Sequence, residues 1–502
     1  MPRSRENPLA LDASVDFRGL RELFTQARYT TQGLEQTLDI PDIGVTPGVN
    51  LSLCKRRLPR DQPVATFFRL FRMGVAVSQD EARRAFAPFS LAAVVDTGLV
   101  HLDGDSVTSP FDLQTYAELL LLSDRVMRRT EKSGPELHVD HVLGVSASGI
   151  ISDVLTIRTP AETGLDLGTG NGLLALLAAR HVKQMVATDV TDRALNVAAF
   201  NAKLNGLENV TFRKGSWFEP VAGEKFDRIV SNPPFVSSPE TKLILRDGGM
   251  RGDGVTQLVA QGIAAHLKEG GFGTMIGSWG AEPTTDWATR PREWLAQGQV
   301  DGFALLTELA DPVQYATKWL GLQAKTSEEV DALLPSWLDY YEACGLPGFA
   351  TGGLVLRKTP PGVANVFFGF PIPPSSSPRP CSDQLLRQFQ AVDYLRALPF
   401  EEALLERRFR LTDSHQVTQH ARFQQGQVQI TNCVLQLTQG TSFSEPLNPI
   451  GFHFLGHCDG KRSVKEVIEA VHGITKFPLE KLVPASLDAV QRWLVSGMIV
   501  AV

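Results

Sequence analysis

The sequence predicts an α/β fold in which helices cover both faces of a largely parallel sheet. The middle of the 502-residue chain alternates strand-like and helix-like stretches, a pattern typical of repeated strand-helix-strand units. In chain order these stretches are GLDLG, LLALLAARH, MVATDV, DRALNVAAFNAKLNG, VTFRKG and FDRIVSNPP. A glycine-rich turn, DLGTGNG, joins the first strand to the first helix. Because ligands of such sheets bind beyond the carboxyl ends of the strands, functional residues are expected directly after each strand.

The chain is too long for one domain, since a single apolar core stops growing beyond ~250 to 300 residues. Residues 371–380, PIPPSSSPRP, contain five prolines and three consecutive serines, and this composition predicts an exposed linker. The predicted units are an N-terminal helical domain at 1–140, an α/β domain at 141–370 and a C-terminal domain at 381–502. Two amphipathic helices, DPVQYATKWL and SWLDYYEACG, predict a helical insertion in the α/β domain at about 290–350.

Both flanking units have patterns typical of small winged-helix-like folds. In the first, helical periodicity in FRGLRELFTQARY, ATFFRLFRMG and QDEARRAFAPF precedes a hairpin-like stretch, VVDTGLVHLDGDSVTSP. In the last, the strand-like VQITNCVLQL precedes a helix that Ser463 and Glu466 can cap at capping-box spacing. The helix SLDAVQRWLVSG and the strand MIVAV complete this α+β unit. Such folds bind nucleic acid or peptides, or only pack against their neighbours.

The composition excludes several classes of protein. The formal net charge is −6, which excludes a chain-wide polycation that grips phosphate backbones. The five cysteines are scattered, and no apolar run approaches the ~20 residues that span a bilayer, so we expect a cytoplasmic protein without membrane contact. The basic cluster Lys55, Arg56, Arg57 and Arg60 is followed by Asp61 and is interpreted as a solvated surface.

The glycine-rich turn is the first candidate ligand site. It comprises Asp166, Leu167, Gly168, Thr169, Gly170, Asn171 and Gly172. Glycines let the backbone turn tightly and approach a ligand that a Cβ would exclude, and the next helix begins with free N–H groups. On its own, this turn is equally typical of an ordinary strand-to-helix connection.

An acidic residue follows the second strand. Asp189 ends MVATD, 21 residues after Gly168, where a carboxylate can accept hydrogen bonds from both hydroxyls of a ribose. Turn and acid together predict a nucleoside-containing ligand, but an NAD enzyme would have both features.

The third motif separates these alternatives. Asn232, Pro233, Pro234 and Phe235 follow the strand that begins at Phe226. The prolines fix an extended backbone, so the Asn232 side-chain oxygen and the Pro233 carbonyl can point into one cleft. Two such acceptors on an amide or aromatic amine draw off developing positive charge and orient the nitrogen lone pair toward an electrophile. Phe235 offers a flat face to a planar acceptor group.

With these three motifs in this order, residues 141 to about 280 resemble the class I S-adenosylmethionine-dependent methyltransferases that carry an Asn-Pro-Pro-aromatic motif. That amino-methylating group includes adenine and ribosomal RNA guanine exocyclic-amine methyltransferases and release-factor glutamine methyltransferases. The resemblance implies a Rossmann-like sheet, S-adenosyl-L-methionine as cofactor, and methyl transfer to nitrogen.

The resemblance also implies roles for individual residues. Cofactor contacts fall on the glycine loop, on the acid and its neighbour, and on the segment GSWFEP; they are Asp166, Gly168, Thr169, Gly170, Asn171, Gly172, Asp189, Val190, Ser216, Trp217 and Asn232. The catalytic motif is Asn232, Pro233, Pro234 and Phe235. One position departs from many relatives, which have an acidic residue near the adenine where this chain has Ser216. Either this serine replaces the lost hydrogen bond, or Trp217 covers the adenine.

Two flanking segments extend the candidate site. HVLGVSASG, residues 141–149, could close over the methionine moiety through Ser146 and Ser148, or could be a plain strand and turn. RDGGMRGDG, residues 246–254, is interpreted as a flexible lid, with a helix-capping loop as the alternative.

No metal is expected, and two tryptophans are interpreted as packing residues. His141, His181 and His266 have no cysteine or carboxylate partners at metal-ligand spacing. Trp279 and Trp287 are interpreted as core residues rather than a surface for stacking bases.

The leading hypothesis is an N-methyltransferase that acts on an exocyclic amino group of a nucleic-acid base, in RNA rather than DNA. The Asn-Pro-Pro-Phe motif suits planar aromatic amines, and winged-helix-like units can bind nucleic acid. However, residues 1–140, 141–374 and 375–502 carry formal charges of −2, −5 and +1, so no segment has the electrostatic footprint of phosphate binding. The alternatives are a methyltransferase of a protein glutamine or other peptide nitrogen, and an inactive cofactor-binding scaffold.

Overall fold

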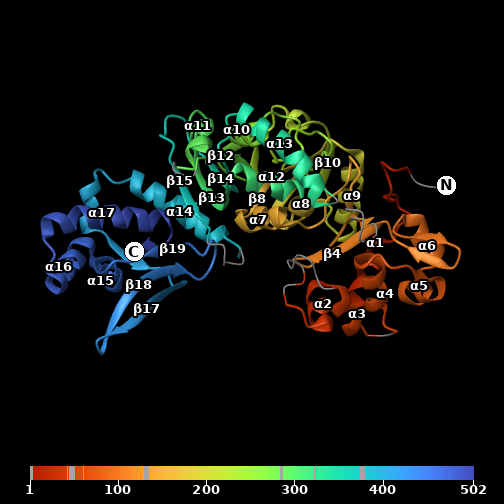
Figure 1. Cartoon of the computed structure of the whole chain (residues 1–502), viewed down its shortest axis with the longest axis horizontal. Coiled ribbons are helices and arrows are strands. Elements are labelled where there is room, and N and C mark those ends of the chain that lie inside the picture. Colours follow the sequence, from red (N-terminus) through yellow and green to blue (C-terminus); the bar gives the residue numbers. More distant parts are fainter. Residues whose placement is uncertain are drawn as a thin grey trace.

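An α/β unit lies between an N-terminal and a C-terminal unit in the computed structural model of the chain (Figure 1). The described residues are 4–41, 43, 51–59, 61–125, 127–128, 135–282, 286–321, 324, 326–372 and 379–502. Arg60 of the basic cluster and residues 373–378 of the predicted linker lie outside these ranges.

The α/β unit is built on an eight-stranded sheet with the order β10-β9-β8-β11-β12-β14-β13-β15. The five strands from β10 to β12 are mutually parallel, β14 is antiparallel to both of its neighbours, and β15 is parallel to β13. Their bounds are β8 (Ala161–Leu167), β9 (Val182–Asp189), β10 (Val210–Lys214), β11 (Phe226–Ser231), β12 (Leu267–Gly280), β13 (Val300–Ala310), β14 (Phe349–Lys358) and β15 (Phe367–Pro371). The chain builds outward from β8 to β10 and then returns to β11, so the strand order reverses between β8 and β11. A ligand crevice forms at the carboxyl ends of strands at such a reversal.

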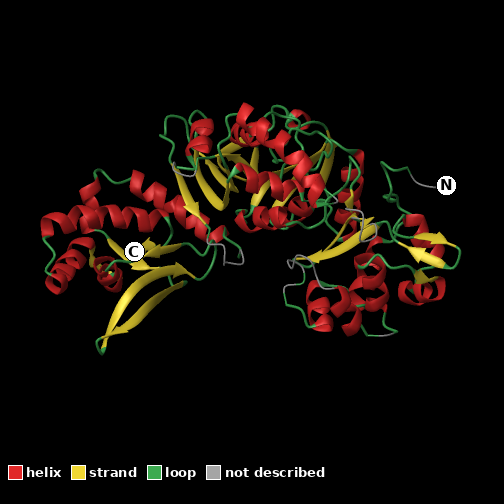
Figure 2. Cartoon of the chain, in the orientation of Figure 1, coloured by secondary structure: helices red, strands yellow, loops and turns green. Residues whose placement is uncertain are grey.

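Helices cover both faces of this sheet (Figure 2). On one face, α10 (Gly254–His266) and α11 (Thr289–Leu295) share a core with alternate residues of β13 and β14. On the other face, α7 (Ala147–Leu155) and α14 (Ser382–Arg396) pack against the intervening residues. The helices α8 (Leu173–Ala178) and α9 (Asp192–Leu204) lie against β8, β9 and β10.

Strand β13 lies within the segment for which the sequence predicted only helices. Its sequence, VDGFALLTELA, is a nearly continuous apolar run whose first six residues are all buried. Such a run shows no alternation, so periodicity cannot separate it from a buried helix. The two predicted amphipathic helices are present as α12 (Pro312–Leu320) and α13 (Ser327–Ala343). A capping box of Asp311 and Gln314 starts α12.

The N-terminal unit combines short helices with a three-stranded sheet and a separate hairpin. Its helices are α1 (Phe17–Gln26), α2 (Thr31–Leu38), α3 (Leu51–Arg57), α4 (Pro63–Phe67), a π-helical turn (Phe68–Arg72), α5 (Gln79–Phe86) and α6 (Leu91–Thr97). Its strands are β1 (Val77–Ser78), β2 (His101–Asp103), β3 (Ser106–Thr108), β4 (Phe111–Tyr116) and β5 (Leu119–Asp124), with β6 (Met127–Arg128) and β7 (Pro135–Glu136) after them. The sheet has the order β1-β3-β2, and β4 pairs with β5 alone. In the core of this unit, the ring of Phe67 meets those of Phe24 and Phe86 edge to face.

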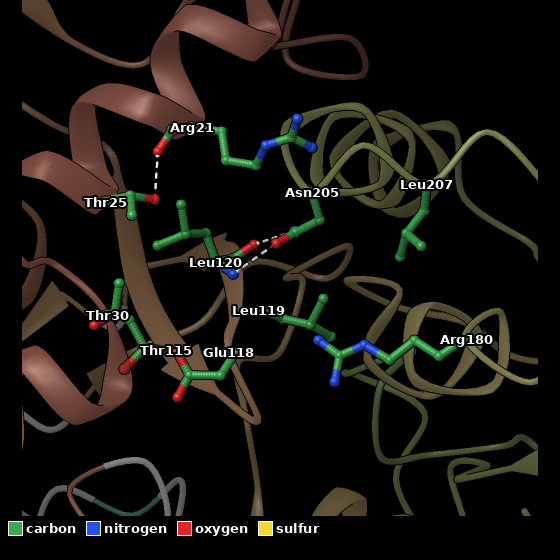
Figure 3. Close-up of a pocket in the computed structure, with 10 residues that line it drawn as sticks. All are labelled: Arg21, Thr25, Thr30, Thr115, Glu118, Leu119, Leu120, Arg180, Asn205 and Leu207. Atoms are coloured by element: carbon green, nitrogen blue, oxygen red, sulfur yellow. Dashed lines mark hydrogen bonds between the residues drawn. The ribbon is translucent and has the colours of Figure 1, made fainter.

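Helix α9 joins this unit to the α/β unit. Its residues Val197, Phe200 and Leu204 belong to the N-terminal core, and the rings of Phe17 and Phe200 meet edge to face at 5.0 Å. Figure 3 shows the hydrogen bonds between Asn205 and the backbone of Leu120, beside a cavity of about 210 Å³. The two units therefore share one continuous core.

The C-terminal unit begins with α14 on the central sheet. Asp301 of β13 is fully buried and pairs with Arg357 of β14 and Arg396 of α14. Burial opposes ionisation of Asp301, but hydrogen bonds from both arginines hold its pKa below the ordinary value. These ion pairs attach α14 to the sheet.

The remainder of this unit contains two small sheets, one 3-10 helix and three α-helices. Its elements are a 3-10 helix (Glu401–Glu406), β16 (Arg408–Leu411), β17 (His415–Gln424), β18 (Gln427–Leu437), β19 (Ser444–Pro446), α15 (Pro449–His457), β20 (Asp459–Ser463), α16 (Val464–Thr475), α17 (Leu479–Val495) and β21 (Ile499–Ala501). The predicted capping box of Ser463 and Glu466 is confirmed at the start of α16. Helix α17 begins at Leu479, earlier than the predicted start at Ser486. The β17–β18 hairpin extends away from the rest of the chain (Figure 1).

Within the ranges given above, no helix has both the length and the hydropathy needed to cross a bilayer.

Candidate active site

A cavity of about 1020 Å³ lies at the reversal of strand order. Almost every residue proposed from the sequence lines it: Asp166, Gly168, Thr169, Gly170, Asn171, Asp189, Val190, Ser216, Trp217, Asn232, Pro233, Pro234 and Phe235. Gly172 is the exception, because it is the N-cap of α8 and faces α9. Its φ of 89° requires glycine, and a Cβ there would lie 3.2 Å from the Ala198 Cβ. Gly172 therefore serves the turn and helix packing rather than the cavity wall.

The two other loop glycines line open space. Gly168 and Gly170 have φ of 73° and 55°, and a Cβ added at either would meet no atom within 4 Å. The backbone, rather than crowding, requires glycine at both positions. A side chain there would project into space that a ligand can occupy.

Asp166 fixes the start of the glycine loop and of α8. Its Oδ2 accepts hydrogen bonds from Thr169 Oγ1 at 2.7 Å and from the Ala175 backbone N–H at 2.9 Å. Its Oδ1 is buried and has no hydrogen-bond partner within the described chain. Burial raises the pKa of Asp166 to about 7, although both hydrogen bonds oppose this shift.

Asp189, at the end of β9, anchors the other side of the loop. One oxygen accepts the Gly170 backbone N–H at 3.0 Å, and the other accepts the backbone N–H and the hydroxyl of Thr191. Burial raises the pKa of this carboxyl as well. Asp189 therefore orders the loop whose glycines face the cavity.

Asn232 and Pro233 stand just beyond the end of β11. The hydroxyl of Ser231 donates to the Leu167 carbonyl at 2.8 Å, which holds the ends of β11 and β8 together. Among the residues that the structure describes, none hydrogen-bonds to the Asn232 side chain or to the Pro233 carbonyl. The Asn232 amide lies near the first turn of α7, with its Nδ2 4.0 Å from the position of a Cβ at Gly149. Both groups thus keep their hydrogen-bonding capacity, and both residues line the cavity.

Phe235 begins a second, aromatic part of the cavity. Its ring meets Trp319 edge to face at 5.9 Å, and the Lys318 ammonium lies 5.6 Å from the centre of the Trp319 ring. Lys318 also pairs with Glu308 of β13. Five residues that line this part were not predicted from the sequence: Thr307, Glu308, Lys318, Trp319 and Thr351. The capping box of Asp311 and Gln314 marks the start of α12 but does not show which residues of that helix face the cavity.

The positions with two alternative interpretations in the sequence also line the cavity. Ser216 and Trp217 both do, and Trp217 has a φ of 48°, an uncommon backbone conformation for a tryptophan. Ser146 caps α7 by accepting the Gly149 N–H, and its hydroxyl lies 3.0 Å from that of Ser148. The segment 141–149 is thus a short loop and a helix start.

The segment 246–254 is tied to its surroundings. Arg246 is only 4% exposed and makes two hydrogen bonds to Asp247, at 2.6 and 3.0 Å. Asp247 Oδ2 also accepts the backbone N–H groups of Lys242 and Leu243 at 3.0 Å. These contacts anchor Arg246 and Asp247 in the loop before α10. The flexible lid, with a helix-capping loop as its alternative, stays a prediction.

The histidines and tryptophans that were given no role in the site pack within the fold. The described part of the chain contains no group of three or more metal-binding side chains. Burial lowers the pKa of His141 and brings that of His181 to about 4, while His266 stacks on Phe218 at 4.5 Å. Trp279 is fully buried and donates to the Trp287 carbonyl at 2.7 Å.

Comparison with known proteins shows which kind of domain contains the cavity. Residues 146–271 match the family described as methyltransferase small domain. The segment is a class I S-adenosylmethionine-dependent methyltransferase domain. The predicted Rossmann-like sheet and the predicted cofactor are confirmed for it. Residues 26–110, which precede this methyltransferase domain, match a domain of unknown function (DUF7059).

Similar proteins cover only part of the chain. A release factor glutamine methyltransferase of Xylella fastidiosa is 41% identical over 128 residues, which are 23% of this chain and 46% of that protein. A ribosomal protein uL3 glutamine methyltransferase of Bradyrhizobium diazoefficiens is 35% identical over 156 residues, 28% of this chain and 48% of that protein. The chain thus spans about half the length of these curated relatives of the methyltransferase domain.

The predicted preference for an RNA or DNA base as partner is wrong. These relatives are named for methylation of glutamine in proteins, not of bases. Nucleic-acid binding was inferred from the Asn-Pro-Pro-Phe motif and the winged-helix-like pattern, and the names of these relatives do not support it.

The cavity of the methyltransferase domain fits S-adenosylmethionine. Gly168 and Gly170 leave open space where a side chain would intrude. Asp166 Oδ1 and Asn171 Nδ2 are buried without hydrogen-bond partners among the described residues. Such unpaired polar atoms are costly unless a ligand or water satisfies them.

Proposed function

We propose that the protein is an S-adenosylmethionine-dependent N-methyltransferase whose acceptor is the side-chain amide of a glutamine in another protein. One observation carries the proposal: Asn232 and Pro233 line the same cavity as the glycine loop and Phe235, and the Asn232 side chain and the Pro233 carbonyl have no hydrogen-bond partner among the described residues. Two acceptors suit the two N–H bonds of a primary amide. The names of the relatives support glutamine in particular.

The cofactor is assigned to the half of the cavity around the glycine loop. Gly168 and Gly170 let the cofactor approach the backbone. Asp189 and Val190 contact its ribose, and Ser216 and Trp217 contact its adenine. Asp166 acts by holding Thr169 and Ala175 in place. When bound, S-adenosylmethionine supplies a methyl group on a positively charged sulfur.

The chain's own residues must make a poor nucleophile reactive. An amide nitrogen delocalises its lone pair into the carbonyl, so positive charge on the nitrogen is costly as its new bond to carbon forms. The Asn232 side-chain oxygen and the Pro233 carbonyl accept both N–H groups, stabilise this charge and aim the lone pair. Phe235 and Trp319 hold the amide in a water-poor pocket. The proton leaves to solvent after transfer, because the methylated nitrogen has by then become acidic.

Tritium transfer from labelled cofactor to purified bacterial release factor and to purified ribosomal protein uL3 tests the proposal. We expect label in protein, resistant to nuclease and released by protease, with the mass of one methylene group on a glutamine. Asn232→Ala should abolish transfer and leave the cofactor Kd within about threefold. Asn365→Ala, which lies outside the cavity, is the control for loss of an asparagine. Label in RNA, or collapse of cofactor affinity in Asn232→Ala, would contradict the assignment.

A further inference from the structure

We propose that the β4–β5 hairpin of the N-terminal unit is part of the cofactor site, with Asn201 and Gln114 as its positioning residues. Two separate segments that contribute to the cavity wall, the glycine loop and residues 141–146, are connected to the hairpin, the first through Asn201 of α9 and the second directly. The inference depends on S-adenosylmethionine as the cofactor but not on the identity of the acceptor.

Asn201 makes the first connection. It is fully buried on α9, and its Oδ1 accepts the Leu122 backbone N–H of β5 at 2.9 Å. Its Nδ2 donates to the Leu122 carbonyl at 2.9 Å and to the Asn171 carbonyl at 2.8 Å. A single amide group therefore ties the hairpin to the residue between Gly170 and Gly172.

Gln114 and Asp124 make the second connection. Gln114 of β4 accepts the Val145 backbone N–H at 2.6 Å. Asp124 of β5 accepts the Val142 N–H at 2.8 Å, and its own N–H donates to the Val142 carbonyl at 3.0 Å. The approach is close enough that a Cβ at Gly144 would lie 2.3 Å from Gln114 Oε1. The segment 141–146 thus lies against the hairpin over most of its length.

These contacts set the spacing of two walls of one cavity. The glycine loop and residues 141–146 belong to different parts of the chain. The hairpin bonds directly to residues 141–146 and is linked to the glycine loop through the Asn201 side chain. Fixing both walls before the ligand arrives lowers the ordering cost of binding. The hairpin should therefore contribute to cofactor affinity without touching the cofactor.

Helix α9 supplies matched controls for Asn201. Asn205 accepts the Leu120 N–H and donates to the Leu120 carbonyl at 2.9 and 2.8 Å, and Asn196 makes the same pair of bonds with Leu9 at 2.9 and 3.0 Å. All three asparagines thus bind an N-terminal backbone segment in the same way. Of the three, Asn201 alone also bonds to the glycine loop.

The test compares Asn201→Ala with Asn205→Ala and Asn196→Ala in the full chain. We expect Asn201→Ala to raise the Kd for S-adenosylmethionine, measured by calorimetry, about tenfold, the effect of one lost charge-free hydrogen bond in a buried site. Amide hydrogen exchange at residues 168–173 of the cofactor-free protein should accelerate in this variant. The two controls should lower the Tm comparably and change the Kd by less than about twofold. Equal Kd changes in all three variants, or an unchanged Kd in Asn201→Ala, would overturn the inference.

Gln114 provides an independent test should Asn201→Ala fail to fold. Gln114→Ala removes the acceptor for Val145, and we expect a several-fold rise in the cofactor Kd with faster exchange at residues 142–146. Gln114→Glu retains an acceptor oxygen and should restore most of the affinity. If Gln114→Glu bound the cofactor as weakly as Gln114→Ala, the hydrogen bond to Val145 would not be the cause. Neither readout requires methyl transfer, so failure of the glutamine proposal would leave this test intact.

Discussion

Replacing Asp166 by Asn should change the pH dependence of stability in a defined direction. Burial raises the pKa of Asp166 from 3.8 to about 7, so the folded chain holds this proton more tightly than the unfolded chain. Between these two values the folded state binds more protons, and the free energy of unfolding therefore falls as pH rises. This rise in the pKa corresponds to at most about 4 kcal/mol of the free energy of unfolding. That contribution is present at low pH, is lost by pH ~7 and does not change further above that pH. Asn cannot ionise, and its oxygen can still accept the bonds from Thr169 and Ala175.

The assay is thermal unfolding of the cofactor-free protein from about pH 4 to about pH 8. As pH rises across this range, the Tm of wild type should fall relative to that of Asp166→Asn. The expected change is about 2 to 4 °C per kcal/mol for a unit of this size. The buried amide nitrogen adds a cost that does not vary with pH, so the slope is diagnostic rather than the offset. Asp413→Asn, whose side chain is 91% exposed, should show no such slope. A parallel pH dependence in Asp166→Asn and wild type would refute the assignment of a raised pKa.

Two further substitutions have matched controls. Gly170→Ala and Gly223→Ala both place a Cβ in open space at positive φ, at a cost of about 1 to 2 kcal/mol each. Only Gly170→Ala should also weaken cofactor binding in calorimetry, and equal weakening in both would contradict a ligand beside the loop. Asp301→Ala leaves two arginines without their buried partner and should lower the free energy of unfolding by about 3 to 5 kcal/mol. Asp393→Ala removes a half-exposed carboxylate and should cost at most about 1 kcal/mol by urea unfolding, so a comparable loss would contradict this role for burial.

The half of the cavity around the glycine loop was predictable because its parts are local in sequence. Asp166 to Gly172 form one turn, and Asp189 and Asn232 each stand at or just after the end of a strand. In a parallel sheet the carboxyl ends of β8, β9 and β11 share one edge, so position relative to a strand end predicts proximity in space. Gly172 shows the limit of this reasoning, because the motif does not reveal which glycine faces the ligand and which faces a helix.

The aromatic half was not predictable from local patterns. Thr307 and Glu308 lie at the end of β13, whose buried run has no alternation to mark it as a strand. Lys318 and Trp319 lie on α12, and their place in the cavity depends on how α12 packs back toward Phe235. That packing is a tertiary contact between segments more than 80 residues apart, and no spacing in the sequence encodes it.

The error about the acceptor has a physical origin. In the proposed roles Asn232 and Pro233 accept N–H groups, and a glutamine amide and an exocyclic base amine offer the same two, so the motif specifies the nitrogen and not the molecule that carries it. The winged-helix-like pattern was an argument by analogy of fold, and folds do not determine ligands. The charge of the segments was the stronger argument, since a protein that grips phosphates needs cations near them. The segment that contains the methyltransferase domain carries a formal charge of −5, and Lys318 on the aromatic wall of the cavity is paired with Glu308. An acceptor without phosphates is what this balance favours.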